Sequence, residues 1–240
     1  MSASVCLPVG GDSRSAVVET LRDILDAAAR GVFPPADGRT TVVPQHCARD
    51  AGVIAFTGHS VVFTDEDPQW VHDTLGGLDC DALAATMNAR FIAAFLERTG
   101  RTTDTIDVMT VASPRPGEPP LAVREIRDPA HSRVVSSRRR RDDVRVWAAD
   151  GGVLVLGRGV AGRLEAAVEV AEAVRHRGLG RALALAARHL AGGEPVWAQI
   201  SPGNARSLRA FQAAGYRPVG SEALFISAGP RSAGRSDGSA

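Results

Sequence analysis

The amino-acid sequence predicts an α/β fold of the α+β kind, in which a mixed sheet is flanked by helices and preceded by a smaller α/β domain. Three observations carry this expectation. Apolar residues recur with period two in some stretches and period 3.6 in others. A proline-rich stretch divides the chain near its middle. After it, the order is strand, helix, three strands, glycine turn, helix, strand, helix and strand over residues 121–226.

Composition favours a globular protein of the reducing cytosol. The 240 residues are 44% hydrophobic, enough for a sizeable core. Their 28 basic and 27 acidic side chains nearly cancel, which favours neither nucleic acid nor an acidic membrane surface as a partner. No apolar run approaches the roughly 20 residues of a membrane span, and no secretory signal is recognisable. We therefore expect a cytoplasmic protein.

Cysteine and histidine spacing argues against a metal site. Cys6, Cys47 and Cys80 are scattered, without the Cys-x-x-Cys spacing of zinc ribbons. The histidines likewise show no ligand spacing. The sequence predicts no disulfide framework and no metal.

The first part of the chain predicts helices and short strands without a motif of assignable role. A helix capped by Asp12 or Ser13 presents Val17, Leu21 and Leu25 on one face. The further expected elements are strands at 41–43, 53–56, 61–63 and 106–111, and helices at 68–75 and 81–98. A hairpin turn at residues 57–60 joins the second and third strands.

The linker at residues 112–120 contains four prolines, which fix φ and remove backbone donors. It predicts a domain boundary. We expect an N-terminal α/β domain over residues 1–117, a second domain over 118–227, and a disordered tail over 228–240, where Ser, Gly and Arg dominate.

The second domain has a clearer pattern. The expected strands are 121–126, 144–148, 153–156, 163–170, 196–200 and 216–225. The expected helices run from the Asp128-Pro129 start signal to about Arg138, from Gly180 onward, and from Asn204 to about Ala214.

The turn between residues 170 and 180 predicts an anion site. Arg175 and Arg177 precede Gly178 and Gly180, where an amphipathic helix begins. Free backbone N–H groups and the positive end of the helix dipole favour a phosphate there. Glycines let the backbone approach it closely.

Two motifs in this domain resemble those of the Gcn5-related N-acetyltransferase (GNAT) family. Arg175-x-x-Gly178-x-Gly180 matches the family's pyrophosphate signature, five residues after Val170 at the end of the fourth strand. About 25 residues on, Asn204 to Tyr216 resembles the second signature, Asn-x-x-Ala/Ser-x-x-x-Tyr/Phe-x-x-x-Gly-Phe/Tyr. The resemblance covers roughly the last 105 ordered residues and implies a mostly antiparallel, twisted GNAT-type sheet.

The resemblance implies acetyl-CoA (coenzyme A) as cofactor. In this family the fourth and fifth strands splay apart, and the pantetheine arm lies along the fourth. The implied cofactor contacts are Val168, Val170, Arg175, His176, Arg177, Gly178, Leu179, Gly180, Arg181, Asn204, Ser207 and Phe211. The backbone N–H near Val170 would polarise the thioester carbonyl.

Direct attack of a primary amine on the thioester needs a base, for which Glu165 and Glu169 are the candidates. Family bases often lie several residues before the valine, which places Glu165 slightly ahead; the alternative is that both are solvated strand residues paired with arginines. The family's usual tyrosine acid is Phe211 here, so water protonates the thiolate, or the domain is a catalytically weak CoA-binding sensor or scaffold.

Other patterns have plainer interpretations. Gly157-x-Gly159-x-x-Gly162 matches a dinucleotide-binding fingerprint, but a strand follows it where a helix is required, which favours a hairpin turn. Arg138–Arg141 reads as a solvated helix end or as a contact to the CoA 3′-phosphate. The acceptor is expected to be a small-molecule amine, with peptide N-termini and protein lysines as alternatives, and the N-terminal region to shape the acceptor side or to form a homodimer.

Overall fold

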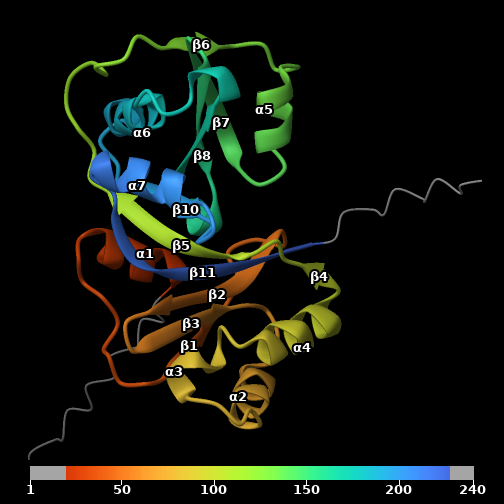
Figure 1. Cartoon of the computed structure of the whole chain (residues 1–240). Helices are drawn as coiled ribbons and strands as arrows, with labels where there is room; N and C mark the ends of the chain where they lie inside the picture. Colours follow the sequence, from red (N-terminus) through yellow and green to blue (C-terminus); the bar gives the residue numbers. More distant parts are fainter. Residues whose placement is uncertain (1–19, 228–240) are drawn as a thin grey trace, which may run out of the picture.

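The structure, a computed structural model, describes residues 20–227 (Figure 1). The predicted helix start at Asp12 or Ser13 and the predicted tail at 228–240 lie outside the described residues. Within them, one sheet of 11 strands runs through the molecule in the order β1-β3-β2-β11-β5-β10-β9-β8-β7-β6, with β4 beside β11. The strands are β1 Thr40–Val43, β2 Asp50–Phe56, β3 His59–Phe63, β4 Arg101–Thr102, β5 Ile106–Ala112, β6 Arg124–Ile126, β7 Asp142–Ala149, β8 Gly152–Arg158, β9 Leu164–Val170, β10 Val196–Ile200 and β11 Arg217–Ser227.

Most neighbouring strands in this sheet are antiparallel, and parallel pairing joins β1 to β3 and β9 to β10. The mixed, mostly antiparallel sheet that the sequence predicts is confirmed. The hairpin turn at residues 57–60 is confirmed as well, since β2 and β3 pair antiparallel around it.

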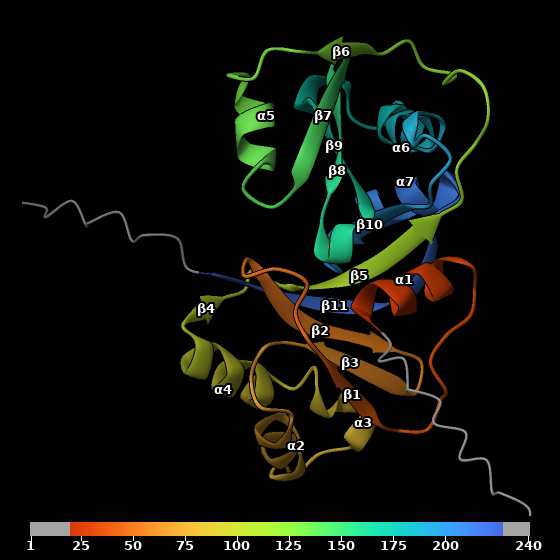
Figure 2. The same ribbon diagram turned by 180° about the vertical axis from the view of Figure 1, so that it is seen from behind.

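Helices cover both faces of the sheet. One face carries α1 (Leu21–Ala29) and α5 (Ser132–Ser137), as the view of the molecule from behind shows (Figure 2). The other carries α2 (Pro68–Gly76), α3 (Ala82–Ala85) and α4 (Ala89–Thr99) over the N-terminal strands, and α6 (Leu179–Leu190) and α7 (Ala205–Ala213) over the C-terminal strands. The helical positions facing the sheet are apolar and buried, as Ile24 and Leu25 of α1 and Leu183 of α6 show.

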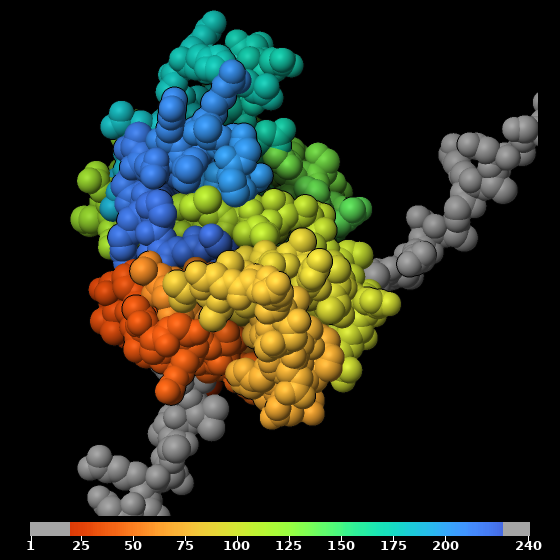
Figure 3. All heavy atoms as spheres, turned by 60° about the horizontal axis from the view of Figure 1, so that its bottom comes forward, coloured from red at the N-terminus to blue at the C-terminus, as the bar shows by residue number. Residues whose placement is uncertain are grey.

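The sheet is continuous across the predicted domain boundary. β5 precedes the proline linker in sequence, yet it lies between β10 and β11 of the C-terminal region and pairs antiparallel with both. β11 in turn pairs with β2 of the N-terminal region. In Figure 3, the orange to yellow N-terminal residues accordingly form one continuous surface with the green and blue C-terminal residues. The two regions on either side of residue 117 therefore share one sheet. A domain boundary at residue 117 stays a prediction.

The strands β9 and β10 separate soon after they meet. Their parallel pairing has two positions, Val196 opposite Leu164 and Trp197 opposite Glu165. Beyond Glu165, β9 continues to Val170 and pairs only with β8 on its other side. Over its last five residues, the edge of β9 that faces β10 therefore has no strand partner.

Three expected elements differ from the structure. The single helix predicted at 81–98 is wrong: extended backbone at Asn88 (ψ 135°) separates α3 from α4, and its side chain accepts a hydrogen bond from Arg90 N–H. The helix expected from Asp128 begins later, at Ser132, because the Asp128 side chain accepts from Ala130 N–H in a turn instead. The strand expected at 121–126 has only its last three residues in the sheet.

Within residues 20–227, no helix is both long and apolar enough to cross a bilayer.

Candidate functional site

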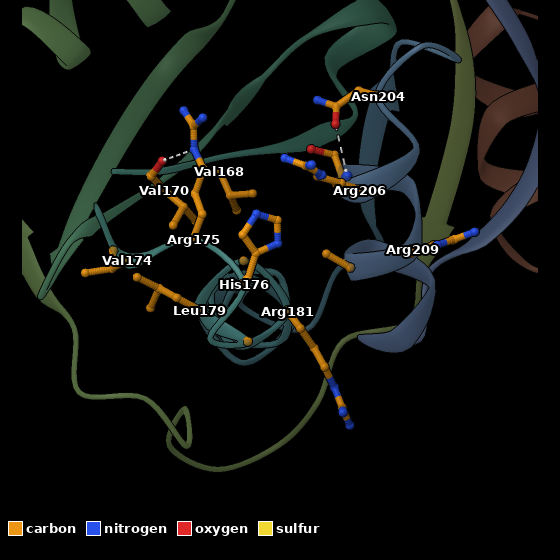
Figure 4. Close-up of a pocket in the computed structure, with 14 residues that line it drawn as sticks. Val168, Val170, Val174, Arg175, His176, Leu179, Arg181, Asn204, Arg206 and Arg209 are labelled. Atoms are coloured by element: carbon orange, nitrogen blue, oxygen red, sulfur yellow. Dashed lines mark hydrogen bonds between the residues drawn. The ribbon is translucent and has the colours of Figure 1, made fainter. Parts of the chain in front are cut away.

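A cavity of about 650 Å³ lies on the α6 and α7 face, at the end of β9 (Figure 4). Its size falls in the range of small-molecule sites, about 300–1,000 Å³. It is lined by Val168, Val170, Val174, Arg175, His176, Gly178, Leu179, Gly180, Arg181, Asn204, Arg206, Ser207, Arg209 and Ala210. We call it the basic cavity, because four arginines and one histidine line it and no carboxylate does among the described residues.

The turn that enters α6 has the backbone of an anion site. His176 (φ 66°) and Gly178 (φ 83°) both adopt the left-handed region, which is uncommon for a residue other than glycine. Gly178 caps α6, and no side chain bonds the first N–H groups of that helix. These N–H groups and the helix dipole favour negative charge. Strain of this kind collects at ligand sites.

Side chains around the cavity differ in direction. His176 and Arg206 point toward one another across it, whereas Arg181 and Arg209 extend outward (Figure 4). The Arg175 guanidinium donates to the backbone carbonyl of Val170 at 3.4 Å, tying the turn to the end of β9. Asn204 accepts from Ser207 N–H at 3.1 Å and so caps α7, as its position predicts.

Ten of the twelve cofactor residues predicted from the sequence line this cavity. Arg177 lies exposed in the turn before α6 and does not line the cavity. Phe211 lies outside it: the residue is 3% exposed and packs edge-on against Tyr216, with ring centroids 4.8 Å apart. The helix face that carries Phe211 is turned into the core, and its assignment as a cofactor contact stays a prediction. The sequence reading missed Val174, Arg206, Arg209 and Ala210, although Arg206 and Arg209 lie within the second motif.

Tyr216 is also a core residue. Its ring is 2% exposed, and its hydroxyl donates to the backbone carbonyl of Ala184 at 3.3 Å. Burial raises the pKa of this phenol, so it keeps its proton. This is the environment of a packing residue.

On the opposite face of the sheet, Glu165 is buried in a network of ion pairs. It is 3% exposed. Its carboxylate accepts from Arg141 and Arg163, both at 2.9 Å, and from Gln199 at 2.6 Å. Burial opposes its charge, but the two guanidiniums outweigh this and lower the pKa of Glu165. The backbone N–H of Val160 is a fourth donor, at 3.3 Å. A carboxylate held ionised by four donors is a weak base.

Glu169 lies on the same face of β9 but in solvent. Its side chain is 56% exposed and forms an ion pair with Arg133 of α5. This is the solvated, arginine-paired environment that the sequence offers as the alternative to catalysis. The base assignments of Glu165 and Glu169 stay predictions.

A second cavity, of about 180 Å³, adjoins this network on the α1 and α5 face. Four carboxylates line it, and we call it the acidic cavity. They are Asp104, Asp107, Glu165 and Glu222. The sequence reading missed Asp104, Asp107 and Glu222, because nothing local to β5 or β11 shows that β5 lies between β10 and β11.

The described residues contain no group of three or more His, Cys, Asp or Glu side chains that could hold a metal ion.

The fold and site define a class of protein with a mixed sheet, two parallel strands that diverge, and a cavity lined by arginines at the start of a helix. No protein-family model matches the chain, and no curated protein gives a significant match. Its fold is similar to solved structures of GNAT enzymes, the family that the two sequence motifs resemble.

Three such structures show this similarity at a remote level. A GCN5-related N-acetyltransferase from Kribbella flavida shares 19% identity at a TM-score of 0.37, covering 58% of this chain and 64% of that one. A GCN5-related N-acetyltransferase from Sphaerobacter thermophilus shares 14% identity at a TM-score of 0.37, covering 57% and 56%. A tandem GNAT protein from the clavulanic acid biosynthesis pathway, solved without AcCoA, shares 14% at a TM-score of 0.34, covering 56% and 57%. The chain spans less than two thirds of the length of each, so its activity is argued from its own residues.

Proposed function

We propose that the protein is an acyl-CoA-dependent N-acyltransferase that transfers an acetyl group from acetyl-CoA to a primary amine by direct attack in a ternary complex. One observation carries the proposal: the basic cavity opens where β9 leaves β10, so that phosphate donors and an unpaired strand edge face the same space. These are the two kinds of partner that an acyl-CoA requires.

The residues present fit the cofactor. Its diphosphate would be held by the N–H groups at the start of α6 and by Arg175 and His176. Its pantetheine amides would pair with the free backbone edge of β9 near Val168 and Val170, beside apolar side chains that suit its carbon chain. Arg206 would supply further positive charge from the other wall.

The cofactor supplies an activated thioester, and the protein supplies position, polarity and proton transfer. The backbone N–H near Val170 would stabilise charge on the carbonyl oxygen as the amine attacks. Tyr216 cannot act as the acid from its buried position, so the thiolate would take its proton from water. We include in the proposal a small-molecule acceptor and a cytoplasmic location, which suits the free thiols of Cys47 and Cys80. Homodimer formation stays a prediction.

Calorimetry with acetyl-CoA, combined with thiol release over a panel of primary amines, tests the proposal. We expect saturable binding and thiol release that depends on the amine. Tight binding without turnover on any amine would favour the sensor instead, and absence of binding would exclude both functions.

Glycine 180 provides a matched pair of variants for the binding experiment. A Cβ at this position would lie 3.7 Å from Val170 Cγ2 and 3.8 Å from the Ala210 Cβ, both ordinary contacts. Gly180→Ala therefore fits, whereas Gly180→Leu would fill the space between β9 and α7 that the cofactor needs. Leucine is a good helix former, so loss of binding in Gly180→Leu would not reflect loss of the helix.

A further inference from the structure

A further cavity, of about 390 Å³, lies beside β1, the strand at one end of the sheet (Figure 1). We call it the edge cavity. Apolar side chains make up most of its wall, among them Ile24 and Ala27 of α1, Val32 and Phe33 of the loop after it, and Val61 of β3. Its volume is that of a small-molecule site. Five strands separate β1 from β9, so the edge cavity and the basic cavity share no residue.

Three polar residues of the edge cavity form one chain of hydrogen bonds. Asp37 Oδ1 lies 2.8 Å from His59 Nδ1, and Thr41 Oγ1 lies 2.9 Å from His59 Nε2. The carboxylate can only accept, so Nδ1 carries a proton and donates it to this bond. In the neutral imidazole Nε2 is then the acceptor, and the Thr41 hydroxyl donates to it. The hydroxyl therefore faces a base that a carboxylate orients.

Asp37 is stabilised in its ionised form. Its bond with the His59 imidazole, followed by a bond from the Arg39 backbone N–H at 2.9 Å, lowers the pKa of this carboxyl. A carboxylate that stays ionised keeps the proton of His59 on Nδ1 and leaves Nε2 free to accept.

Backbone contacts hold the three side chains in place. The Gly38 N–H donates to the Gly58 carbonyl at 2.8 Å, and the Ser60 N–H donates to the Arg39 carbonyl at 3.0 Å. A Cβ at Gly58 would lie 2.8 Å from the Ala36 Cβ, so the loop and the hairpin turn are closely packed. The loop that carries Asp37 is thus fixed to the start of β3, which carries His59, and the chain is preorganised.

β1 also provides unpaired backbone donors. The Arg39 carbonyl points toward β3, since it accepts from Ser60, and successive residues of a strand alternate in direction. The N–H groups of Thr40 and Val42, on either side of Thr41, therefore point away from β3. Among the described residues no strand pairs with that edge of β1.

We propose that the edge cavity is a second catalytic site, which hydrolyses a carboxylic ester with an apolar acyl group, with Thr41 as nucleophile and His59 as general base. Asp37 is the positioning residue. An imidazole that served packing alone would need no accessible hydroxyl, whereas the exposed Thr41 lines a cavity whose apolar wall suits an acyl chain. The inference goes beyond acetyl transfer and needs no cofactor.

The bond and proton changes balance. Thr41 Oγ1 attacks the ester carbonyl carbon while its proton passes to His59 Nε2, and the outward N–H groups of β1 would stabilise the oxyanion. The C–O bond to the alcohol then breaks as His59 returns the proton to the leaving oxygen. Water attacks the acyl-threonine ester in the same way and releases the acid. One ester and one water give one acid and one alcohol.

Hydrolysis of 4-nitrophenyl butyrate by two variants of Thr41 tests the nucleophile. Thr41→Val keeps the shape of the side chain and loses the hydroxyl, whereas Thr41→Ser keeps the hydroxyl. We expect Thr41→Val to lower kcat by about 10²-fold or more and Thr41→Ser to remain active. Thr102→Val, at an exposed position of β4, controls for loss of a strand hydroxyl and should match wild type. Equal rates in Thr41→Val and wild type, including no hydrolysis by either, would overturn the inference.

Covalent trapping tests the site without reliance on one ester. A short-chain alkyl fluorophosphonate should lose fluoride and phosphonylate Thr41 Oγ1, an adduct that peptide mass spectrometry locates. We expect no adduct at residue 41 in Thr41→Val and slower labelling in His59→Gln. An unlabelled Thr41 in wild type, or equal labelling in His59→Gln, would contradict the proposed roles.

The outcomes separate this inference from the proposed function. Thr41→Val should bind acetyl-CoA as wild type does, because no residue of the basic cavity changes. If ester hydrolysis and labelling fail while acetyl-CoA binds and amines are acetylated, the inference is wrong and the proposed function stands. If Thr41 is labelled but acetyl-CoA does not bind, the reverse holds.

Discussion

Glu165 of β9 and Glu222 of β11 share one guanidinium and one amide. Arg163 lies 2.9 Å from Glu165 and 2.6 Å from Glu222, and the Gln199 amide donates to both, at 2.6 and 3.4 Å. The same surroundings shift the pKa values of the two carboxyls in opposite directions, downward for Glu165 and upward for Glu222. The opposite directions follow from the partners: Arg141 and Arg163 both face Glu165, whereas Glu222 faces Arg163 and the Glu165 carboxylate.

Replacing Glu165 by glutamine should destabilise the fold. Arg163 is 2% exposed and would keep only one carboxylate partner. Removing one member of a buried ion pair costs about 3 kcal/mol. Urea unfolding at neutral pH measures the difference, and an unchanged midpoint and slope would contradict the account of this network.

The stability lost in Glu165→Gln should depend on pH. Because the folded pKa of Glu165 lies below its unfolded value, its stabilising contribution is complete above an unfolded pKa of about 4.3 and disappears as pH falls through the folded pKa. The difference in unfolding free energy between wild type and Glu165→Gln should therefore narrow in acid. A constant difference from pH 7 down to acid unfolding would be inconsistent with this sign.

Asp107→Asn should have the opposite effect on stability. Burial raises the pKa of Asp107, so its charged form destabilises the fold once pH exceeds the unfolded value of about 3.9. We expect the variant to be more stable than wild type at neutral pH. Thermal unfolding checks this, and a lower Tm would show that Asp107 stabilises the fold.

Gly180→Leu should weaken acetyl-CoA binding by about tenfold or more, ~1.4 kcal/mol, whereas Gly180→Ala should bind normally and gain a few tenths of a kcal/mol from helix propensity. The reason is the space between Val170 and Ala210, which a single Cβ enters at ordinary contact distance. Calorimetry of the two variants side by side makes the comparison. Equal affinities would place the cofactor elsewhere.

His176→Gly should stabilise the fold by about 1 kcal/mol, since glycine adopts the left-handed backbone at φ 66° without strain. Cofactor binding should weaken at the same time, because an imidazole that points into the basic cavity is lost. Tm and calorimetry together distinguish this from a purely structural residue, for which only Tm would change.

Tyr216→Phe should leave kcat unchanged and lower stability by about 1 kcal/mol, the net value of one hydrogen bond. The lost bond is the one from the Tyr216 hydroxyl to the Ala184 carbonyl. Thiol-release kinetics decide the point: a large fall in kcat at normal acetyl-CoA affinity would indicate that Tyr216 acts as the acid.

Local patterns predicted the elements well where each element is decided by its own residues. The turn from Arg175 to Gly180 lies at a helix start as expected, and Asn204 caps α7. Prediction failed where a polar side chain hydrogen-bonds the neighbouring backbone, as Asn88 does by accepting from Arg90 N–H between α3 and α4. The spacing of apolar residues does not predict such a bond.

Most residues that line the basic cavity could be predicted from the sequence, because they lie in two short segments, the turn before α6 and the start of α7. The packing of Phe211 against Tyr216 was not predictable, because a motif position names the residue while only tertiary packing decides which way the helix turns it.

By itself the sequence determined the period of each element, the linker, and the turn before α6 with its arginines and glycines, since these depend on neighbours within a few residues. The tertiary structure alone decided that β5 lies between β10 and β11, and that Asp107 therefore stands opposite Glu222. Strand order depends on which apolar faces bury one another over separations of more than 100 residues. The charge of a buried carboxyl depends in turn on the partners that this order brings to it.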